Sequence, residues 1–293
     1  MIKVRFWGTR GSIATPGPAT LKYGGNTSCV EVRVNKHILV FDAGTGIHNL
    51  GLQLRQEFGS EPITVHLFIS HTHWDHIQGF PFFLPAYGHQ NRIIIYGPPG
   101  RDKSLRQIMR MQMDSDYFPV AFGDMNPSIE IVEIDAPLTF DGFSVSHFYL
   151  NHPAMSLGYR VSDGARSVIY ATDNEPYQYT LPSHKKADPR PGLHEYLDEK
   201  LIEFLTDTDL YIAEAQYTLD EYKAKLGWGH SPVDTIVDFS LRAKVKRLAL
   251  FHHDPYHDDA FVDSMVAHAK KLLAEKKSPI QCFGAQEGME IDL

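Results

Sequence analysis

The hexapeptide HTHWDH, residues 71–76, places three imidazoles and one carboxylate within six positions. It directly follows the apolar run VHLFIS, which is typical of a buried strand. His71 and His73 are two residues apart, so in an extended segment both imidazoles point to one side. Asp75 and His76 follow once the chain turns. Neutral imidazoles with a carboxylate form the ligand set that zinc and similar divalent metals prefer. A polar turn that merely caps a helix is the alternative, and four such residues in so short a stretch disfavour it.

The motif must be positioned by the strands and helices around it. Runs rich in β-branched and aromatic residues, among them VRFWG, CVEVRV, HILVFD and RIIIYG, predict strands in the first third of the chain. Strands are dense between about 129 and 171, and the last third alternates LYIAEA, RLALFH and IQCF with helical patterns. Strand-rich blocks with helices at both ends predict sheets packed together with helices outside.

The segment NEPYQYTLPSHKKADPRPG, residues 174–192, fits neither pattern because it contains four prolines and mixed charge. Loops of this length inside a compact domain are usually functional or mobile. We predict a surface loop, with a lid or substrate-gripping loop as the alternative. The 293 residues and 43% hydrophobic content suit one or two domains. We predict a single domain over 1–293 with 174–192 as an insertion.

Composition excludes several classes of protein. No apolar run approaches the length of about 18 residues that spans a membrane. The start MIKVRFWGTRGS lacks the features of a secretory signal, which predicts a complete cytoplasmic protein. Two cysteines, Cys29 and Cys282, are too few for a disulfide framework or a cysteine zinc site. The net charge of −8 with scattered Lys and Arg disfavours an extended nucleic-acid surface and favours a small substrate.

HTHWDH resembles the HxHxDH motif of the metallo-β-lactamase superfamily, in its dinuclear hydrolase branch. GTRGS at 8–12 and FDAGTG at 41–46 resemble the early glycine loops of that superfamily. Asp75 supports a hydrolase, since flavin-diiron relatives carry a glutamate inside the motif and perform redox chemistry. The matches run from residue 4 to 255. The resemblance implies an α+β fold, the four-layer αββα sandwich, with the site along one edge of the two sheets.

The resemblance also implies the rest of a metal site. The next ligand of the superfamily follows a strand in the middle of the chain, where FYLNHPAMSLGYRV offers His152. SVIYATD supplies Asp173 as the bridging aspartate, and RLALFHHDP supplies His252, with the adjacent His253 as a competing choice. The predicted metal ligands are His71, His73, Asp75, His76, His152, Asp173 and His252.

If the metal ligands of that superfamily are assigned to the matching positions of this sequence, His71, His73 and His152 would hold one metal. Asp75, His76 and His252 would hold the other, with Asp173 between them. Two divalent ions about 3.5–4 Å apart lower the pKa of a bridging water towards neutrality, which generates a hydroxide nucleophile without serine or cysteine. Zn²⁺ is the favoured metal for histidine-rich ligation, and Mn²⁺ or Fe²⁺ could occupy the same ligands.

Two later segments resemble those of ribonuclease Z-like phosphodiesterases. Glu214 in YIAEAQYT and His230 in WGHSPVDTIVDF match a glutamate and a histidine of that group. Ala213 and Gln216 depart from it, since they replace a histidine and a threonine. A histidine oriented by a carboxylate is a suitable general acid for a phosphodiester leaving oxygen. His230, Glu214 and Asp75 are therefore the predicted catalytic residues, with a local hydrogen bond at a helix start as the alternative for His230.

These features predict a metal-dependent phosphodiesterase that acts on a small phosphodiester such as a 3′,5′-cyclic nucleotide. Two alternatives stay open: a ribonuclease Z-like endonuclease of RNA 3′ ends, and a non-catalytic metal-binding sensor or interaction module. The segment 174–192 is short and weakly basic for an arm that grips transfer RNA. A homodimer is expected from analogy with relatives alone.

Overall fold

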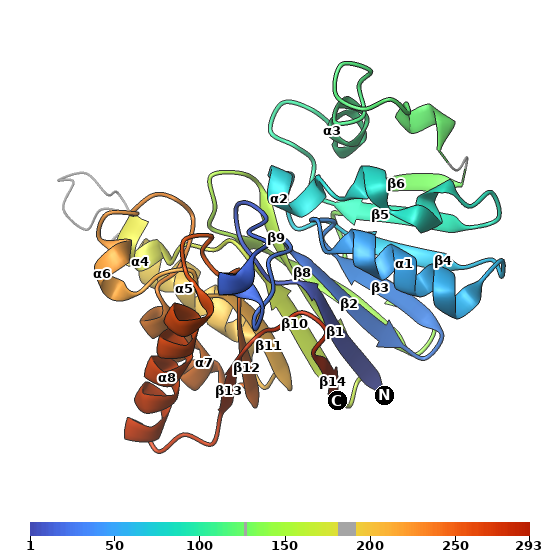
Figure 1. The fold of residues 1–293 in the computed structure, drawn as a ribbon. Helices are drawn as coiled ribbons and strands as arrows, with labels where there is room; N and C mark the ends of the chain where they lie inside the picture. The colour runs from blue at the N-terminus through green and yellow to red at the C-terminus, as the bar shows by residue number, and fades with distance from the viewer. Residues whose placement is uncertain (126–127, 181–191) are drawn as a thin grey trace.

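Two seven-stranded sheets face each other in the computed structural model, which describes residues 1–125, 128–180 and 192–293 (Figure 1). The first sheet has the order β14-β1-β2-β3-β4-β5-β6, with the bounds Glu290–Asp292, Ile2–Gly8, Cys29–Val34, His37–Phe41, Thr64–Phe68, Arg92–Gly97 and Ile129–Glu133. The second has the order β13-β12-β11-β10-β9-β8-β7, with the bounds Gln281–Gly284, Arg247–Phe251, Leu210–Glu214, Ser167–Ala171, Ser156–Ser162, Phe143–Leu150 and Leu138–Phe140.

Both sheets have the same pairing pattern. In the first, β14, β1, β2 and β3 pair antiparallel in turn, and β3, β4, β5 and β6 pair parallel. In the second, β7 to β10 pair antiparallel and β10 to β13 pair parallel. This architectural repeat has no counterpart in a clean sequence repeat. It places β3 and β10 at equivalent positions, where the pairing changes direction.

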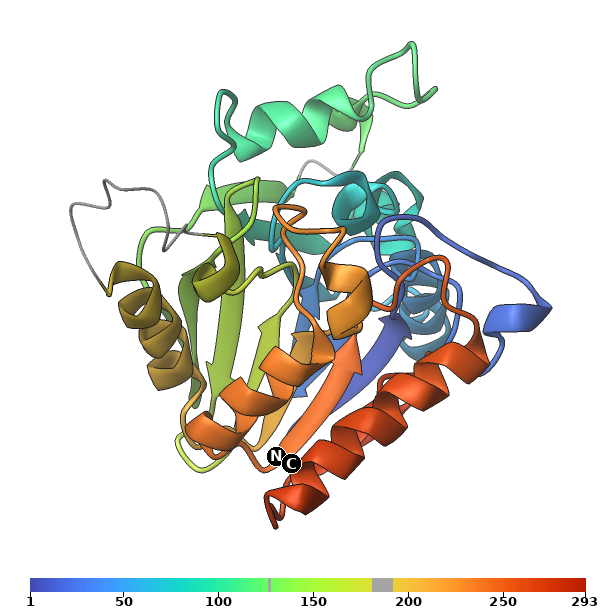
Figure 2. The same cartoon turned by 90° about the vertical axis from the view of Figure 1, so that its left-hand side faces the viewer.

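Helices cover the outer faces of both sheets. The helices α1 (Ile47–Phe58) and α3 (Leu105–Met111) pack on the first sheet, and α5 (Leu193–Leu205), α7 (Val233–Ala243) and α8 (Asp259–Glu275) pack on the second (Figure 2). The short helices are α2 (Trp74–Ile77), α4 (Tyr177–Thr180), α6 (Leu219–Tyr222) and the 3₁₀ turns Pro18–Thr20, Phe80–Phe82, Leu84–Tyr87 and Phe122–Asp124. The αββα prediction is confirmed.

The inner faces of the sheets share one hydrophobic core. Its centre is aromatic: Phe41 stacks on Phe68 with ring centroids 5.2 Å apart, and Tyr159 of the second sheet meets Phe68 edge-on at 5.4 Å. The strands that carry these rings are rich in aromatic and β-branched residues, which pack well on a pleated surface. The first and last strands also pair, β1 with β14, so both termini lie together (Figure 1).

The proline-rich segment predicted over 174–192 is described only in part. Tyr177–Thr180 forms α4, whose start is held by Asp198 of α5, because its carboxylate accepts hydrogen bonds from the backbone N–H groups of Tyr177 and Gln178. Residues 181–191 lie outside the described residues, and with them most of the predicted surface loop and its alternative role as a lid. Every helix within the described ranges is too short or too polar to span a membrane.

Truncation of Phe68 tests the aromatic core. The side chain is fully buried between Phe41, Tyr96 and Tyr159. Phe68→Ala should lower the free energy of unfolding by about 3–5 kcal/mol, since it leaves a cavity where both sheets meet. Urea unfolding measures the effect. Leu52→Ala, at a position 47% exposed on α1, is the control and should change stability by no more than about 0.5 kcal/mol. A similar small loss for Phe68→Ala would contradict this description of the core.

Candidate metal centre

The seven predicted metal-ligand residues lie together at one edge of the two sheets. They follow the ends of strands: His71 to His76 come after β4, His152 after β8, Asp173 after β10 and His252 after β12. Two groups form, and within each the candidate ligand atoms lie within 4.8 Å of one another. The first group is His71, His73, His152 and Asp173, and the second is Asp75, His76, Asp173 and His252. Asp173 belongs to both, which is the arrangement that the sequence predicts.

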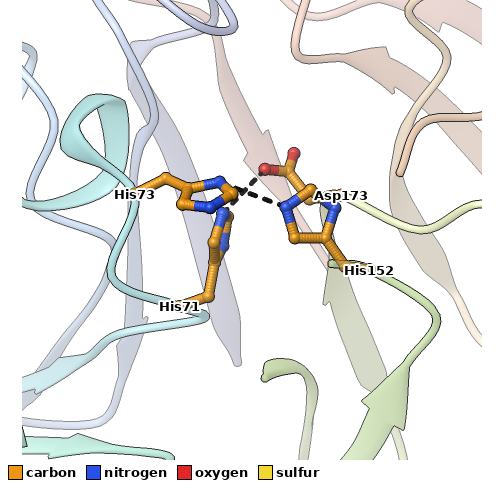
Figure 3. Close-up of side chains that lie close together, drawn as sticks. All are labelled: His71, His73, His152 and Asp173. Atoms are coloured by element: carbon orange, nitrogen blue, oxygen red, sulfur yellow. Dashed lines mark hydrogen bonds and ion pairs between the residues drawn. The ribbon is translucent and has the colours of Figure 1, made fainter. Parts of the chain in front are cut away.

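The first group combines residues that follow strands of both sheets, and the imidazole of His71 lies among them. Its Nε2 lies 3.1 Å from Asp173 Oδ2, and the His152 Nε2 lies 3.1 Å from His73 Nδ1 (Figure 3). His71 Nε2 is buried and forms no hydrogen bond among the described residues. His73 is exposed and His152 is half-buried. A buried ring nitrogen that lies close to a carboxylate oxygen without a well-formed hydrogen bond fits a metal ligand.

The second group is buried throughout. His76 Nε2 lies 3.0 Å from Asp173 Oδ2 and 3.1 Å from Asp75 Oδ2. His252 Nε2 lies 3.1 Å from Asp75 Oδ2 and also 3.1 Å from Asp173 Oδ1. The two imidazoles face each other with their Nε2 atoms 3.3 Å apart. These atoms converge on a shared space between two carboxylates and two imidazoles.

The outer nitrogens of three imidazoles each meet a polar atom outside the donor groups. His71 Nδ1 lies 3.1 Å from Ser70 Oγ, and His152 Nδ1 lies 3.0 Å from the Gly229 carbonyl oxygen. His252 Nδ1 lies 3.1 Å from Gln216 Oε1. Contacts of this kind fix the ring orientation and the tautomer, and they are typical of metal-ligating histidines. Gln216, which replaces the family's threonine, therefore holds His252.

Asp42 completes this outer ring, and the sequence analysis missed it. Its Oδ2 lies 2.7 Å from His76 Nδ1 and accepts hydrogen bonds from the hydroxyls of Tyr170, at 2.6 Å, and Ser70, at 2.8 Å. Its Oδ1 accepts from the Ser70 backbone N–H at 2.7 Å. The signal was present, because Asp42 ends a strand in FDAGTG just as Asp173 ends one in SVIYATD.

Four of the eight non-glycine residues with a positive φ among the described residues lie at the centre. Asp42, Asp173 and His252 have φ values of 60°, 55° and 58°. Ser12, whose N–H donates to Asp75 Oδ2 at 2.8 Å, has a φ of 64°. Residues other than glycine adopt this left-handed region at a cost of about 1–3 kcal/mol each, and such residues cluster at functional sites. Each of the four turns a functional side chain or N–H group toward the metal centre.

The N-terminal loop GTRGS forms a wall behind His252. A Cβ at Gly11 would lie 2.4 Å from both Cε1 and Nδ1 of that imidazole, so only glycine fits. The buried Arg10 anchors the loop, since it donates to the carbonyl oxygens of Gly24, Asp254 and His257. The neighbouring His253 is also buried, and it contacts the Ala285 carbonyl oxygen and the Tyr23 ring. This geometry favours His252 over His253 as the ligand.

Burial and charge set the protonation of the donor atoms. Burial lowers the pKa of His71, and it lowers that of His152 to about 4, which keeps both imidazoles neutral. Burial alone would raise the pKa of Asp173, but His252, His76 and His71 hold it well below its usual range. Metal ligation needs neutral imidazoles and ionised carboxylates. His76 differs, because burial lowers its pKa but Asp75, Asp173 and Asp42 together outweigh burial and raise it well above the usual value. The donor set fits two divalent cations, and a cation bound at the second group would displace the proton of His76.

His230 and Glu214 lie next to each other beside the second group, but no direct hydrogen bond joins them among the described residues. His230 Nδ1 lies 3.8 Å from Glu214 Oε2 and 3.8 Å from Asp173 Oδ1. Burial lowers the pKa of His230 to about 3. Burial and then Asp173 raise the pKa of Glu214 well above its usual range. Glu214 Oε1 instead accepts from the Ser231 N–H at 2.5 Å, so it fixes the loop that carries His230.

Glu175 is a second buried carboxylate that supports this loop, and the sequence analysis missed it. Its Oε1 accepts from the Tyr222 hydroxyl at 2.5 Å and from the Gly227 N–H at 2.7 Å, and its Oε2 accepts from the Gly229 N–H at 2.8 Å. Gly229 has a φ of 90° and would place a Cβ 2.2 Å from His152 Nδ1. The loop is therefore fitted closely against a predicted metal ligand.

The chain is similar in sequence and in fold to several known proteins. The family model described as "Beta-lactamase superfamily domain" matches residues 37–253. A Ribonuclease Z of Natronomonas pharaonis is 25% identical over 283 residues, which cover 86% of each chain. Unliganded yeast PDE1 has a TM-score of 0.70 at 14% identity and covers 100% of this chain and 99% of its own. The short form of human tRNase Z has a TM-score of 0.63 at 21% identity, with 99% and 98% covered. The two structural likenesses establish the fold alone.

Gly11→Ala tests the wall behind His252. The new methyl group must displace the imidazole, so the affinity for one of two metal ions should fall about 10–100-fold or more, the range for loss of a supporting contact. Metal content per chain after dialysis, measured by mass spectrometry, checks this. Gly17→Ala, further along the connection between β1 and β2, is the control, because a Cβ there meets no atom within 4 Å. Two tightly bound metals in Gly11→Ala would refute the close fit.

Proposed function

The chain belongs to the beta-lactamase superfamily and is a metal-dependent hydrolase, and from this premise we propose that it cleaves phosphodiesters. The observation that carries the proposal is the pair of ligand groups that share Asp173, with His230 and Glu214 beside them. Relatives named Ribonuclease Z support this reaction class. A non-catalytic sensor has less support, because such a module would not need a second group of donors with His230 next to it.

In this proposal the two groups described above hold one divalent cation each, with Asp173 between them. Bound there, the cations would act as Lewis acids on the phosphodiester and lower the pKa of water. The protein supplies the fixed donor geometry. Asp75, held by the Ser12 N–H, and His76, held by Asp42, keep the second group in place. Zn²⁺ fits the histidine-rich ligation best, and Mn²⁺ or Fe²⁺ are the alternatives.

We assign His230 as the residue that protonates the leaving oxygen. Its ring centroid lies 5.6 Å from that of His152 and 5.3 Å from that of His252, so it faces both groups. Burial keeps its imidazole neutral in the free protein, with a pKa of about 3. A phosphodiester anion within about 4–6 Å would raise this pKa, since an opposite charge favours the protonated form. Glu214 acts as a positioning residue through the Ser231 N–H.

The scarcity of cations in the segment that follows α3 favours a small phosphodiester such as a 3′,5′-cyclic nucleotide over a polyanion. No Lys or Arg occurs between Arg110 and Arg160. The exposed charged residues of the segment 111–125 are Asp114, Asp116 and Asp124. A protein that follows a polyanion needs several cations along its path. The second candidate is an RNA 3′-end endonuclease, which the names of the sequence relatives favour. A cytoplasmic location and a homodimer stay predictions.

One set of assays separates these functions. Metal-loaded protein should hydrolyse a chromogenic phosphodiester and at least one member of a cyclic-nucleotide panel. It should leave a precursor transfer RNA intact. Cleavage of the precursor with no turnover of cyclic nucleotides would replace the first candidate by the second. No turnover of any substrate with two metals bound would refute the phosphodiesterase proposal.

His230→Ala tests the proton donor. Turnover of the chromogenic phosphodiester should fall about 10²–10⁴-fold, the range for loss of a general acid, while metal content stays at the wild-type level. His268→Ala removes a 45% exposed histidine on α8 and should leave both quantities unchanged. Loss of a metal from His230→Ala would instead make His230 a ligand, which is a third grouping that the geometry allows with Glu214 and His252.

A further inference from the structure

A groove of about 850 Å³ opens beside the first ligand group. One wall is α2 with the residues around it, from Thr72 to Phe82. The opposite wall comes from the loop after β5, α3 and the segment that follows, up to Phe118. The loop 153–155 after β8 closes one side. This volume lies within the range of about 300–1,000 Å³ that small-molecule sites occupy.

The groove displays large apolar side chains to solvent. Trp74 and Tyr117 are both 78% exposed, Phe82 is 56% exposed and Met111 is 53% exposed. Phe82 packs edge-on against Phe118 with ring centroids 5.4 Å apart. Single exposed hydrophobic residues are ordinary, but a gathering of them in one concave surface marks a binding site.

The groove is continuous with the metal centre. His73, the exposed member of the first ligand group, is part of its lining. Thr72 and Trp74 flank it, and Pro153 to Met155 directly follow His152. A molecule whose phosphodiester lies at the first ligand group would therefore extend its attached group into the groove.

The groove has cationic side chains, which would attract an anionic ligand, at one place in its lining. Arg101 and Lys103 are exposed and line it, with Asp102 between them. Neither cation forms an ion pair with another residue in the described part of the chain. Two cations and one carboxylate give a local charge that suits a mononucleotide and is too small for a nucleic-acid path.

We propose that this groove binds the nucleoside of the phosphodiester substrate, whose base stacks on Tyr117 and Phe82. The inference rests on the phosphodiesterase function proposed above and names its substrate class as nucleotides. Every nucleobase has an aromatic face, and stacking on an aromatic side chain contributes about 1–3 kcal/mol per base. A second copy of the chain is the rival occupant of an apolar surface. It would block the approach to His73, whereas a nucleotide uses both the groove and the metal centre.

Two chromogenic esters with the same leaving group test the groove. One is the p-nitrophenyl ester of thymidine 5′-phosphate, and the other is methyl p-nitrophenyl phosphate, which has no base. Wild-type protein should prefer the thymidine ester. Tyr117→Ala should lower the ratio of kcat/KM for the thymidine ester to that for the methyl ester about 10-fold, equivalent to about 1.4 kcal/mol. Phe82→Ala should act in the same direction.

Tyr196→Ala is the matched control, because Tyr196 is a 56% exposed tyrosine on α5, outside the groove lining. It should leave the ratio at the wild-type value. Calorimetric titration with thymidine 5′-monophosphate supplies a readout that needs no turnover. Tyr117→Ala should weaken this binding by a similar factor, and Tyr196→Ala should not.

The outcomes separate the two proposals. If neither ester is hydrolysed with metals bound, the phosphodiesterase function fails, and the titration alone decides whether the groove binds a nucleotide. If both esters are hydrolysed and Tyr117→Ala leaves the ratio and the binding unchanged, the groove inference fails. A lower sedimentation coefficient for Tyr117→Ala with an unchanged ratio would assign the groove to a second copy of the chain.

Discussion

The carboxylate of Asp173 is the contact on which the metal centre depends. One oxygen lies 3.1 Å from His71 Nε2 and 3.0 Å from His76 Nε2, and the other lies 3.1 Å from His252 Nε2. These imidazoles come from both sheets, so a single side chain on β10's loop joins the two halves of the fold. Removing a buried carboxylate from water is costly unless it is paired. The fold meets this requirement by directing three imidazoles at one aspartate, and the same concentration of donors suits divalent cations.

An aspartate follows each of the two strands at which the pairing changes direction. β3 and β10 are the strands where pairing changes from antiparallel to parallel. Asp42 follows β3 and Asp173 follows β10, and both adopt a left-handed backbone. Asp173 is itself a candidate ligand. Asp42 lies behind His76 and links it to Tyr170 of the other sheet. Equivalent positions thus supply one candidate ligand and one support.

The sequence predicts the candidate ligand residues better than the residues that hold them in place, and the reason is physical. HTHWDH is contiguous, so local geometry alone brings four donors together. His152, Asp173 and His252 each end a strand, and the order of strands in a resembling family locates them. Asp42, Gly11 and Glu175 act through contacts with segments far away along the chain, and only packing reveals those. Residue types suggested that Glu214 orients His230, and the structure shows the route: the two side chains are 3.8 Å apart, and the carboxylate accepts a hydrogen bond from the N–H of the next residue, Ser231.

The donor residues and the groove beside them lie on different parts of the fold. The HTHWDH motif therefore indicates the type of reaction but does not identify the substrate. The donors sit on strand ends, where the sheets, the left-handed residues and the buried supports leave little freedom. The groove beside His73 comes from α2, α3 and loops, whose exposed side chains contribute little to the core. Loops on a rigid scaffold can change without disturbing it. Proteins with the same centre can therefore differ in substrate, and under the groove proposal the aromatic rings, more than the histidines, select the substrate of this chain.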